Sequence, residues 1–235
     1  MRVLITGTSR GLGLEFVRQL AARGDCVFAT CRFPDQASAL NDLQVRYGDL
    51  VSITELDVAN PKSIAQSFDT ISTQTGALDV LINNAAISSN RQLDDDGIGS
   101  FDLERMQRIL TINTIAPMLI IQQYLDLLKA GNQPKIINIS SRHGSFALRK
   151  LPPPETYSAS KAALNMYTRN LSYNLKDAGV ITIALSPGWV KTFQGGPNAD
   201  ITPKESIGGM LQLIDSLTLE DSGGFFSYIG ETVPW

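Results

Sequence analysis

Residues 3–13 read VLITGTSRGLG, an apolar run that ends in a glycine-rich segment. Residues 3–5 favour a buried β-strand, and a helical pattern with its apolar residues on one stripe follows the glycines. Strand, glycine turn and helix in this order leave several backbone N–H groups at a helix N-terminus, where the macrodipole also favours an anion. The sequence therefore predicts a phosphate-binding turn at Gly7, Gly11 and Gly13.

Strand and helix patterns alternate along the rest of the chain. Further strands are expected at residues 26–30, 51–57, 78–82, 135–141, 181–185 and 223–228. Helices are expected at 35–47, 61–76, 102–129 and 156–177, and a last long helix begins at the capping box Thr202–Glu205. This alternation predicts one Rossmann-type, doubly wound α/β domain over residues 1–235, with a seven-stranded parallel sheet between helices.

Length, charge and cysteine content narrow the class of protein. The chain has 235 residues, a formal net charge of −3 and 2 cysteines. This charge gives no reason to expect a nucleic-acid partner, and no apolar run approaches the roughly 20 residues that span a bilayer. Met1 leads directly into the first strand, so we expect no signal peptide and a cytoplasmic protein. Cys26 and Cys31 should point to opposite faces of one strand as two thiols.

The end of the second expected strand, at Cys31 and Arg32, is where the adenosine ribose of a bound dinucleotide commonly lies. An acidic residue at this point would accept a hydrogen bond from a ribose 2′-hydroxyl group, but the first acid, Asp35, comes three residues later. Arg32 and Arg10 instead supply two guanidinium groups suited to a 2′-phosphate. These residues favour NADPH over NADH.

Polar and small residues follow the next two strands. The carboxylate of Asp57, which precedes Val58, could accept a hydrogen bond from an adenine amino group, or it could cap the next helix. The fourth strand ends in Asn83-Asn84-Ala85-Ala86. Its small residues leave space for a cofactor, and its asparagines can tie neighbouring strand ends together.

The long helix expected at residues 102–129 contains Pro117. Proline has no N–H group to give to the carbonyl four residues back, which belongs to Asn113. We therefore expect a kink that leaves the Asn113 carbonyl free to hold a water molecule. The alternative is a proline kink with no further role.

Tyr157 and Lys161 lie four residues apart at the start of an expected helix and share one face. A lysine ammonium beside a phenol favours the phenolate, so we expect Lys161 to lower the pKa of Tyr157. Ser141 stands at the C-terminal edge of the fifth expected strand. The physical chemistry of the sequence does not separate it from its neighbour Ser140.

Taken in order, these segments resemble the motif set of the short-chain dehydrogenases/reductases. The set consists of the glycine turn in T-G-x-x-x-G-x-G spacing, Asp57-Val58, the stretch after the fourth strand, Asn113 with Ser141, Tyr157-x-x-x-Lys161 and Pro187-Gly188. The short length, residues 195–199 and the C-terminal stretch resemble carbonyl reductases of the C-factor and sniffer type. The resemblance implies a carbonyl reductase that reduces an aldehyde or ketone with NADP(H).

The resemblance also implies a role for each site residue. Tyr157 is the general acid that protonates the carbonyl oxygen, and Ser141 hydrogen-bonds that oxygen. Lys161 lowers the pKa of Tyr157 and holds the nicotinamide ribose, while Asn113 anchors a water that relays protons to Lys161. The implied NADP(H)-binding residues are Gly7, Ser9, Arg10, Gly11, Leu12, Gly13, Arg32, Asp57, Val58, Asn84, Ala85, Ala86, Tyr157, Lys161, Pro187, Gly188, Val190 and Thr192.

Two alternative functions remain open at this point. One is a pteridine or 3-oxoacyl reductase of the same family, and a carrier-protein substrate would need a basic docking patch, for which Arg149-Lys150 is a thin candidate. The other is a non-catalytic NADP(H)-binding signalling protein, which a missing tyrosine or lysine would have favoured.

The remaining expectations concern loops and assembly. Residues 192–210 are expected to form a substrate lid, and His143 either touches substrate or is a loop residue. Asp94-Asp95-Asp96 reads as a solvated loop, and we expect no metal site. The resemblance implies a homodimer or homotetramer that forms through the helices at 102–129 and 157–177, with no nucleic-acid or membrane partner.

Overall fold

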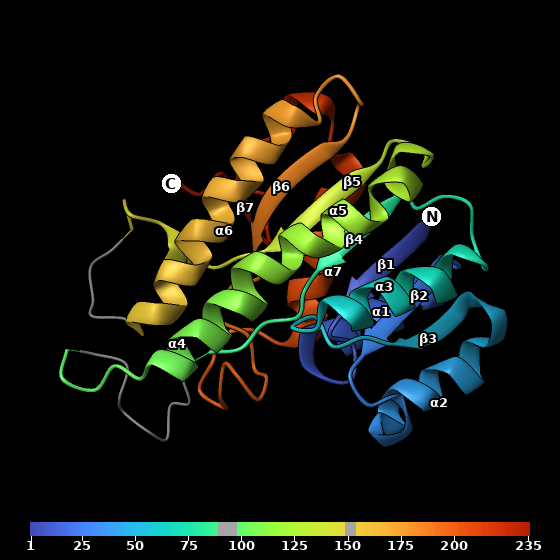
Figure 1. Ribbon diagram of the computed structural model, residues 1–235, viewed down its shortest axis with the longest axis horizontal. Helices are drawn as coiled ribbons and strands as arrows, with labels where there is room; N and C mark the ends of the chain where they lie inside the picture. Colours follow the sequence, from blue (N-terminus) through green and yellow to red (C-terminus); the bar gives the residue numbers. More distant parts are fainter. Residues whose placement is uncertain (89–97, 149–153) are drawn as a thin grey trace.

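Seven parallel strands form one sheet in the computed structural model, which describes residues 1–88, 98–148 and 154–235 (Figure 1). The strand order is β3-β2-β1-β4-β5-β6-β7, and every neighbouring pair runs parallel. The strands are β1 (Arg2–Thr6), β2 (Cys26–Cys31), β3 (Val51–Glu55), β4 (Val80–Asn83), β5 (Lys135–Ile139), β6 (Ile181–Ser186) and β7 (Phe225–Ser227). The doubly wound α/β fold is confirmed.

Helices cover both faces of the sheet (Figure 1). One face carries α1 (Gly11–Ala22), α2 (Ser38–Tyr47) and α7 (Pro203–Ser216); the other carries α3 (Pro61–Ser72), α4 (Leu103–Leu110), α5 (Ala116–Lys129) and α6 (Glu155–Asn174). Because side chains alternate along a strand, Val3 and Ile5 enter the core beneath α1 while Leu4 enters the core beneath α5. The same alternation puts Cys31 in the first core and Cys26 against the second, and both thiols are free.

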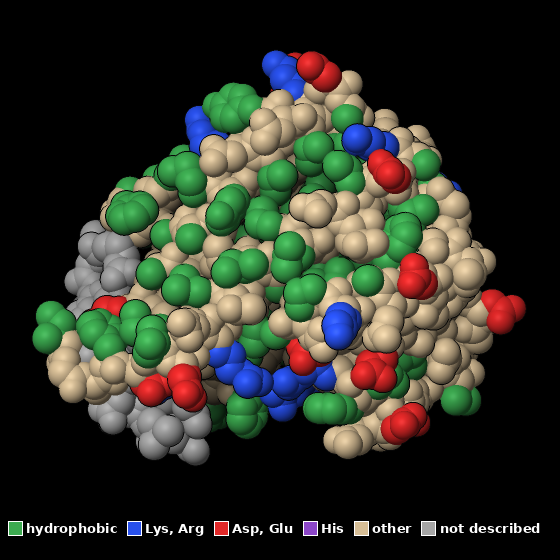
Figure 2. Space-filling view, viewed as in Figure 1, with side chains coloured by type: hydrophobic (Ala, Val, Ile, Leu, Met, Phe, Trp, Pro, Cys, Tyr) green, Lys and Arg blue, Asp and Glu red, His purple; other side chains and the backbone are tan. Residues whose placement is uncertain are grey.

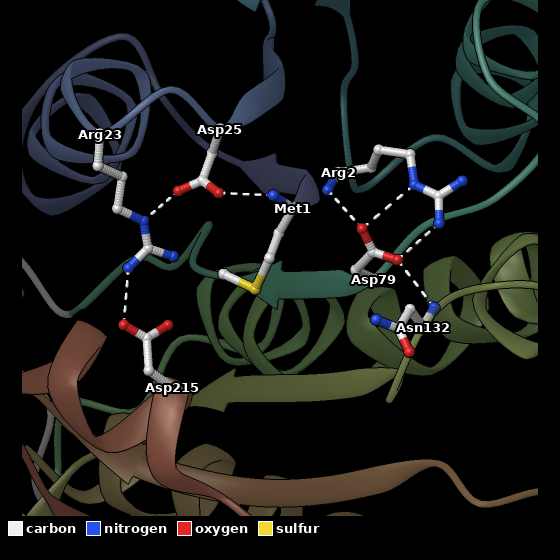
Figure 3. Close-up of polar contacts among 7 residues, drawn as sticks. All are labelled: Met1, Arg2, Arg23, Asp25, Asp79, Asn132 and Asp215. Atoms are coloured by element: carbon white, nitrogen blue, oxygen red, sulfur yellow. Dashed lines mark hydrogen bonds and ion pairs between the residues drawn. The ribbon is translucent and has the colours of Figure 1, made fainter.

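An aspartate anchors the amino-terminal edge of the sheet (Figure 3). Asp79, just before β4, accepts from the backbone N–H and the guanidinium of Arg2 at 2.7 Å each, and from the backbone N–H of Asn132 at 2.9 Å. These hydrogen bonds lower the pKa of Asp79 to about 2, although burial opposes the change. The pair therefore ties β1 to β4 and to the turn before β5.

A second group of charges joins the same edge to the helices (Figure 3). Asp25 pairs with the Met1 ammonium at 2.7 Å and with Arg23, which reaches Asp215 of α7 at 2.9 Å. The amino-terminal edge is thus held by charges. The functional residues lie at the opposite, carboxyl-terminal edge.

The long helix expected at 102–129 is interrupted by a π-helical turn at Thr111–Ile115 between α4 and α5. The Ala116 N–H donates to the carbonyl of Thr111, five residues back. Pro117 sits at the start of α5, where a missing N–H costs least. The structure therefore replaces a simple proline kink with a wider turn.

The expected helix starts after β3 and β6 are confirmed. Asn60 caps α3 by accepting from the Lys62 N–H at 3.0 Å, and Thr202 forms a capping box with Glu205 at the start of α7. Residues 203–210 of the expected lid belong to α7, while 192–202 form a loop. Across the three described ranges, every helix is too short or too polar to cross a bilayer.

Candidate active site

The glycine turn packs so tightly that two of its positions exclude a side chain. Gly7 has a φ of +73°, and a Cβ there would lie 2.9 Å from the Cα of Ala85. A Cβ on Gly13 would lie 2.2 Å from the carbonyl oxygen of Gly7, so the first turn of α1 rests directly on the preceding loop. The N–H groups of Gly7 and Thr8 both donate to the carbonyl of Thr30, at 2.9 and 3.0 Å. These contacts fix the turn against the ends of β2 and β4.

Asn84 ties the end of β4 to the same turn. Its side-chain amide donates to the carbonyls of Thr6 at 2.9 Å and Gly7 at 3.0 Å. The Thr6 hydroxyl accepts in return from the backbone N–H groups of Asn84 and Ala85, each at 3.0 Å. The expected bridging of strand ends is therefore present. Asn83 bridges to Asn138 of β5 at 2.9 Å in the same way.

The N-terminus of α1 is open to an anion. The cap residue Arg10 makes no side-chain capping bond, and the first turn of α1 holds no acid. The guanidinium of Arg10 lies 4.9 Å from the ring centroid of Phe193, and that of Arg32 lies 5.7 Å from the ring of Phe33. Both arginines are exposed, and no described carboxylate pairs with either.

Figure 2 shows Lys and Arg side chains gathered over the carboxyl-terminal ends of the strands. Uncapped N–H groups next to positive charge are the surroundings that a phosphate group prefers. The residues present therefore fit a phosphorylated dinucleotide.

Asp57 closes a local turn and does not cap α3, whose cap residue is Asn60. Its Oδ1 accepts from the Ala59 N–H at 3.0 Å, while its own N–H donates to the Ser63 hydroxyl at 2.9 Å. The side chain is partly exposed, and the neighbouring Val58 packs in the core beneath α3 and α5. Contact between Asp57 and adenine stays a prediction.

Asn113 lies within the π-turn and is fully buried. Its amide makes a paired contact with the backbone of Ile87, accepting at 2.9 Å and donating at 2.8 Å, and it also donates to the Ser160 hydroxyl at 3.0 Å. The side chain thus joins the segment after β4 to α6. Water binding at the Asn113 carbonyl stays a prediction.

The two serines after β5 lie in different surroundings. Ser140 is buried and its hydroxyl donates to the side chain of Asn165 on α6. Ser141 is partly exposed and interacts with the hydroxyl of Tyr157. Only Ser141 therefore lies where it could contact a ligand at Tyr157.

Lys161 is buried from solvent, with 2% of its surface exposed, and among the described residues no acid contributes to its charge state. Its Nζ donates to the carbonyl of Ile139 at 2.8 Å and lies 5.8 Å from the ring centroid of Tyr157. Burial lowers the pKa of Lys161 to about 7. One Nζ contact leaves donor capacity that ribose hydroxyl groups could use.

The pKa of Tyr157 differs in direction from the sequence-based expectation. Burial raises it, although the side chains of Ser141 and Gln194 act in the opposite direction, and Lys161 has no part in the shift. The reason is that the Lys161 ammonium is itself destabilised by burial and is directed to a backbone carbonyl. The ligand-free protein therefore keeps Tyr157 protonated, as a proton donor requires.

Two loops border Tyr157. His143 packs edge-on against the Tyr157 ring, with the centroids 6.0 Å apart. Gln194, whose side chain hydrogen-bonds Tyr157, belongs to the loop after β6, in which Trp189 Nε1 donates to the Gly195 carbonyl at 2.8 Å. Sequence reasoning missed Gln194, because a single polar residue in a glycine-rich loop carries no periodic signal.

The remaining expected cofactor residues follow β6. Gly188 has a φ of +81°, and a Cβ there would lie 2.8 Å from Ile201. Val190 is buried and bridges to Ile201, while Thr192 lies 3.8 Å from the position a Cβ on Gly11 would occupy. The loop thus approaches the glycine turn. Asp94-Asp95-Asp96 and Arg149-Lys150 lie outside the described residues.

The chain is similar to known proteins in both sequence and structure. The family model of the short chain dehydrogenases matches residues 1–200. The C-signal protein of Myxococcus xanthus is 41% identical over 161 residues, which make up 68% of this chain and 95% of C-signal.

Two solved structures are similar along their full length. The NADPH-bound carbonyl reductase from chicken fatty liver has a TM-score of 0.92 and 38% identity, covering 100% of this chain and 98% of that one. Carbonyl reductase Sniffer of D. melanogaster has a TM-score of 0.92 and 32% identity, covering 100% and 99%.

Proposed function

The chain belongs to the short chain dehydrogenase family of oxidoreductases, and on this premise we propose that it is an NADPH-dependent carbonyl reductase acting on an aldehyde or ketone. The observation that carries the proposal is the hydrogen bond between Ser141 and Tyr157, which lie next to the buried Lys161. The similar chicken and fly proteins are carbonyl reductases, and the chicken structure holds NADPH.

The carboxyl-terminal edge of the sheet would hold the cofactor. The uncapped N–H groups at the N-terminus of α1 would bind the pyrophosphate, and Arg10 and Arg32 would pair with a 2′-phosphate. Ala85, Ala86 and the loop from Pro187 to Thr192 would border the nicotinamide end. When bound, NADPH supplies the hydride that reduces the carbonyl carbon.

Tyr157 would donate its hydroxyl proton to the carbonyl oxygen as negative charge develops there. Its raised pKa favours the protonated form in the ligand-free protein. Ser141 would donate a hydrogen bond to the same oxygen and so stabilise the developing charge. The Ser140 hydroxyl is engaged by Asn165 and is unsuited to this role.

Lys161 would hold the ribose hydroxyl groups through the Nζ donors that Ile139 leaves unused. Its pKa of about 7 suits a group that exchanges protons near neutral pH, so it can resupply the Tyr157 hydroxyl. Asn113 would hold the relay water through its backbone carbonyl. Its buried amide fixes the π-turn that presents this carbonyl.

The test follows NADPH and NADH oxidation by wild type, Tyr157→Phe, Ser141→Ala and Ser140→Ala across aldehydes, ketones, pteridines and a 3-oxoacyl thioester. We expect turnover with NADPH that Tyr157→Phe lowers by about 10²–10⁴-fold. Ser141→Ala should lower turnover, and Ser140→Ala should leave far more of it. NADPH binding without turnover of any substrate would instead favour the signalling-protein alternative.

We also propose a cytoplasmic homodimer or homotetramer that forms through α4, α5 and α6. These helices and the π-turn between α4 and α5 expose large apolar side chains: Ile115 of the turn is 48% exposed in the single chain, and Met166 and Tyr173 of α6 are 62% and 65% exposed. Such a surface is typical of an interface between subunits. Light scattering at micromolar concentration tests it, and a monomer would refute it.

A further inference from the structure

The last residues of the chain return to the segment that follows Ser141 (Figure 1). The Ser145 hydroxyl donates to the carbonyl of Pro234 at 2.6 Å, and the Ala147 N–H donates to the carbonyl of Trp235 at 3.0 Å. Ser145 is 1% exposed, and its hydroxyl also accepts from the Leu148 N–H at 3.2 Å. The chain end and this segment therefore form one hydrogen-bonded unit.

Trp235 is itself held from two sides. Its ring stacks on Phe225 of β7, with centroids 5.4 Å apart and planes at 29°. The guanidinium of Arg169 on α6 lies over the Trp235 ring, 5.7 Å from its centroid. Nearby, the Val233 N–H donates to the Phe225 carbonyl at 2.7 Å, and Val233 is 3% exposed. The tail is thus fixed to the sheet before it reaches the segment.

The segment between Ser141 and Ser145 is a single tight turn. Gly144 donates its N–H to the Ser141 carbonyl at 2.8 Å, and Asn165 donates to the Gly144 carbonyl at 3.2 Å. A Cβ on Gly144 would lie 2.8 Å from the backbone of Lys161, so the turn rests on α6. A shift at Ser145 would pass through this turn to Ser141, because close-packed groups have little room to absorb it.

We propose that Pro234 and Trp235 are positioning residues: by holding Ser145 and Ala147, they fix the turn that presents Ser141 to Tyr157. This inference rests on the proposed carbonyl reductase activity. It assigns no chemical step to the tail. In this arrangement Pro234 and Trp235 set the geometry of Ser141 relative to Tyr157.

The experiment compares wild type, Trp235→Ala, Ser145→Ala, their double variant and Trp235→Phe. The matched control is Ser67→Ala, because Ser67 is also 1% exposed and its hydroxyl also makes two contacts, with Ile64 and Tyr124, away from the site. For each we measure kcat and KM for one carbonyl, NADPH affinity, the melting temperature, and hydrogen exchange in the peptide at 141–148.

We expect each single variant to lower kcat/KM by about tenfold, because misplacement of a group by a fraction of an ångström costs this much. The double variant should be no worse than either, since both substitutions loosen the same hydrogen-bonded unit between the tail and residues 145–148, and NADPH affinity should not change. Hydrogen exchange should be faster at 141–148 in the single variants, and Trp235→Phe should retain most of the wild-type activity. Ser67→Ala should lower only the melting temperature.

Three outcomes overturn the inference. The first is a lowered melting temperature with unchanged kcat/KM in Trp235→Ala and Ser145→Ala. The second is full additivity in the double variant. The third is unchanged exchange at 141–148. A wild type that reduces no carbonyl would overturn the proposed function as well, which separates the two failures.

Discussion

Replacing Lys161 with methionine should stabilise the ligand-free protein at neutral pH while abolishing its activity. Lys161 is buried, and no acid in the described part of the chain pairs with it, so folding removes its ammonium from water without a compensating charge. Methionine matches the length of the stem and carries no charge. It gives up one hydrogen bond, from Nζ to the Ile139 carbonyl at 2.8 Å.

The magnitude follows from the change in pKa. Lowering the Lys161 pKa from 10.5 to about 7 corresponds to at most about 5 kcal/mol of unfavourable free energy for the folded, charged state. Loss of the hydrogen bond to Ile139 in the variant offsets about 1–3 kcal/mol of the stability gained by removing the buried charge. Lys161→Met should therefore raise the free energy of unfolding by about 2–4 kcal/mol at pH 7.

The difference in stability between Lys161→Met and wild type should depend on pH in a definite direction. Between about pH 7 and 10.5 the unfolded chain holds a proton on Lys161 that the folded chain has released, so wild-type stability rises with pH from this group. The stability gap between Lys161→Met and wild type should then narrow by about 2 kcal/mol between pH 7 and pH 9. All other groups titrate in both proteins and cancel in the difference.

Urea unfolding followed by circular dichroism at pH 7, 8 and 9, with NADPH absent, measures this gap. Lys129→Met, which removes an exposed lysine from α5, is the control, and its difference from wild type should stay constant. A gap for Lys161→Met that is flat with pH, or that has the opposite sign at pH 7, would refute the reasoning.

Three other predictions concern separate parts of the molecule. Asp79→Asn should lower the free energy of unfolding by about 2 kcal/mol at pH 7, because the pKa of Asp79 is held at about 2; urea titration should show this loss disappear as the pH falls from 4 towards 2. Arg10→Ala combined with Arg32→Ala should lower the preference for NADPH over NADH by about 10²–10⁴-fold in kcat/KM, because each of the two charged contacts to phosphate contributes about 1.5–3 kcal/mol; an unchanged ratio would exclude the 2′-phosphate contact. Gly13→Ala should abolish NADPH binding in a fluorescence titration, since its Cβ would lie 2.2 Å from the Gly7 carbonyl, and retained affinity would show that the turn can widen.

Periodic patterns predicted the fold because the sheet needs buried strands at regular intervals. The ends of the strands were less predictable. The fifth strand was expected to reach Ser141 but ends at Ile139, although Ser140 still donates its N–H to Leu185 of β6. A residue can thus keep one hydrogen bond of the sheet after the strand has ended, and the sequence does not mark this boundary.

The residues of the candidate site were readable from the family resemblance, but their surroundings were not. The sequence places Ser140 and Ser141 on opposite sides of an extended chain, yet it does not say which side faces Tyr157. The pKa of Lys161 depends on how much water the fold removes and on the lack of an acid nearby, and both are properties of the packed protein. Gln194 and Trp235 act across loops, where no period exists to reveal them.

The π-turn at Thr111–Ile115 sets the site by backbone length. Such a turn holds one residue more than the α-helical ladder would, so α5 is rotated by about 100° relative to its continuation from α4. Asn113 reaches both Ile87 and Ser160 from within this turn. A one-codon deletion there would return the two helices to a common phase and swing the amide out of register. Deleting one residue of the turn other than Asn113, with every candidate site side chain retained, would then be enough to dismantle the site.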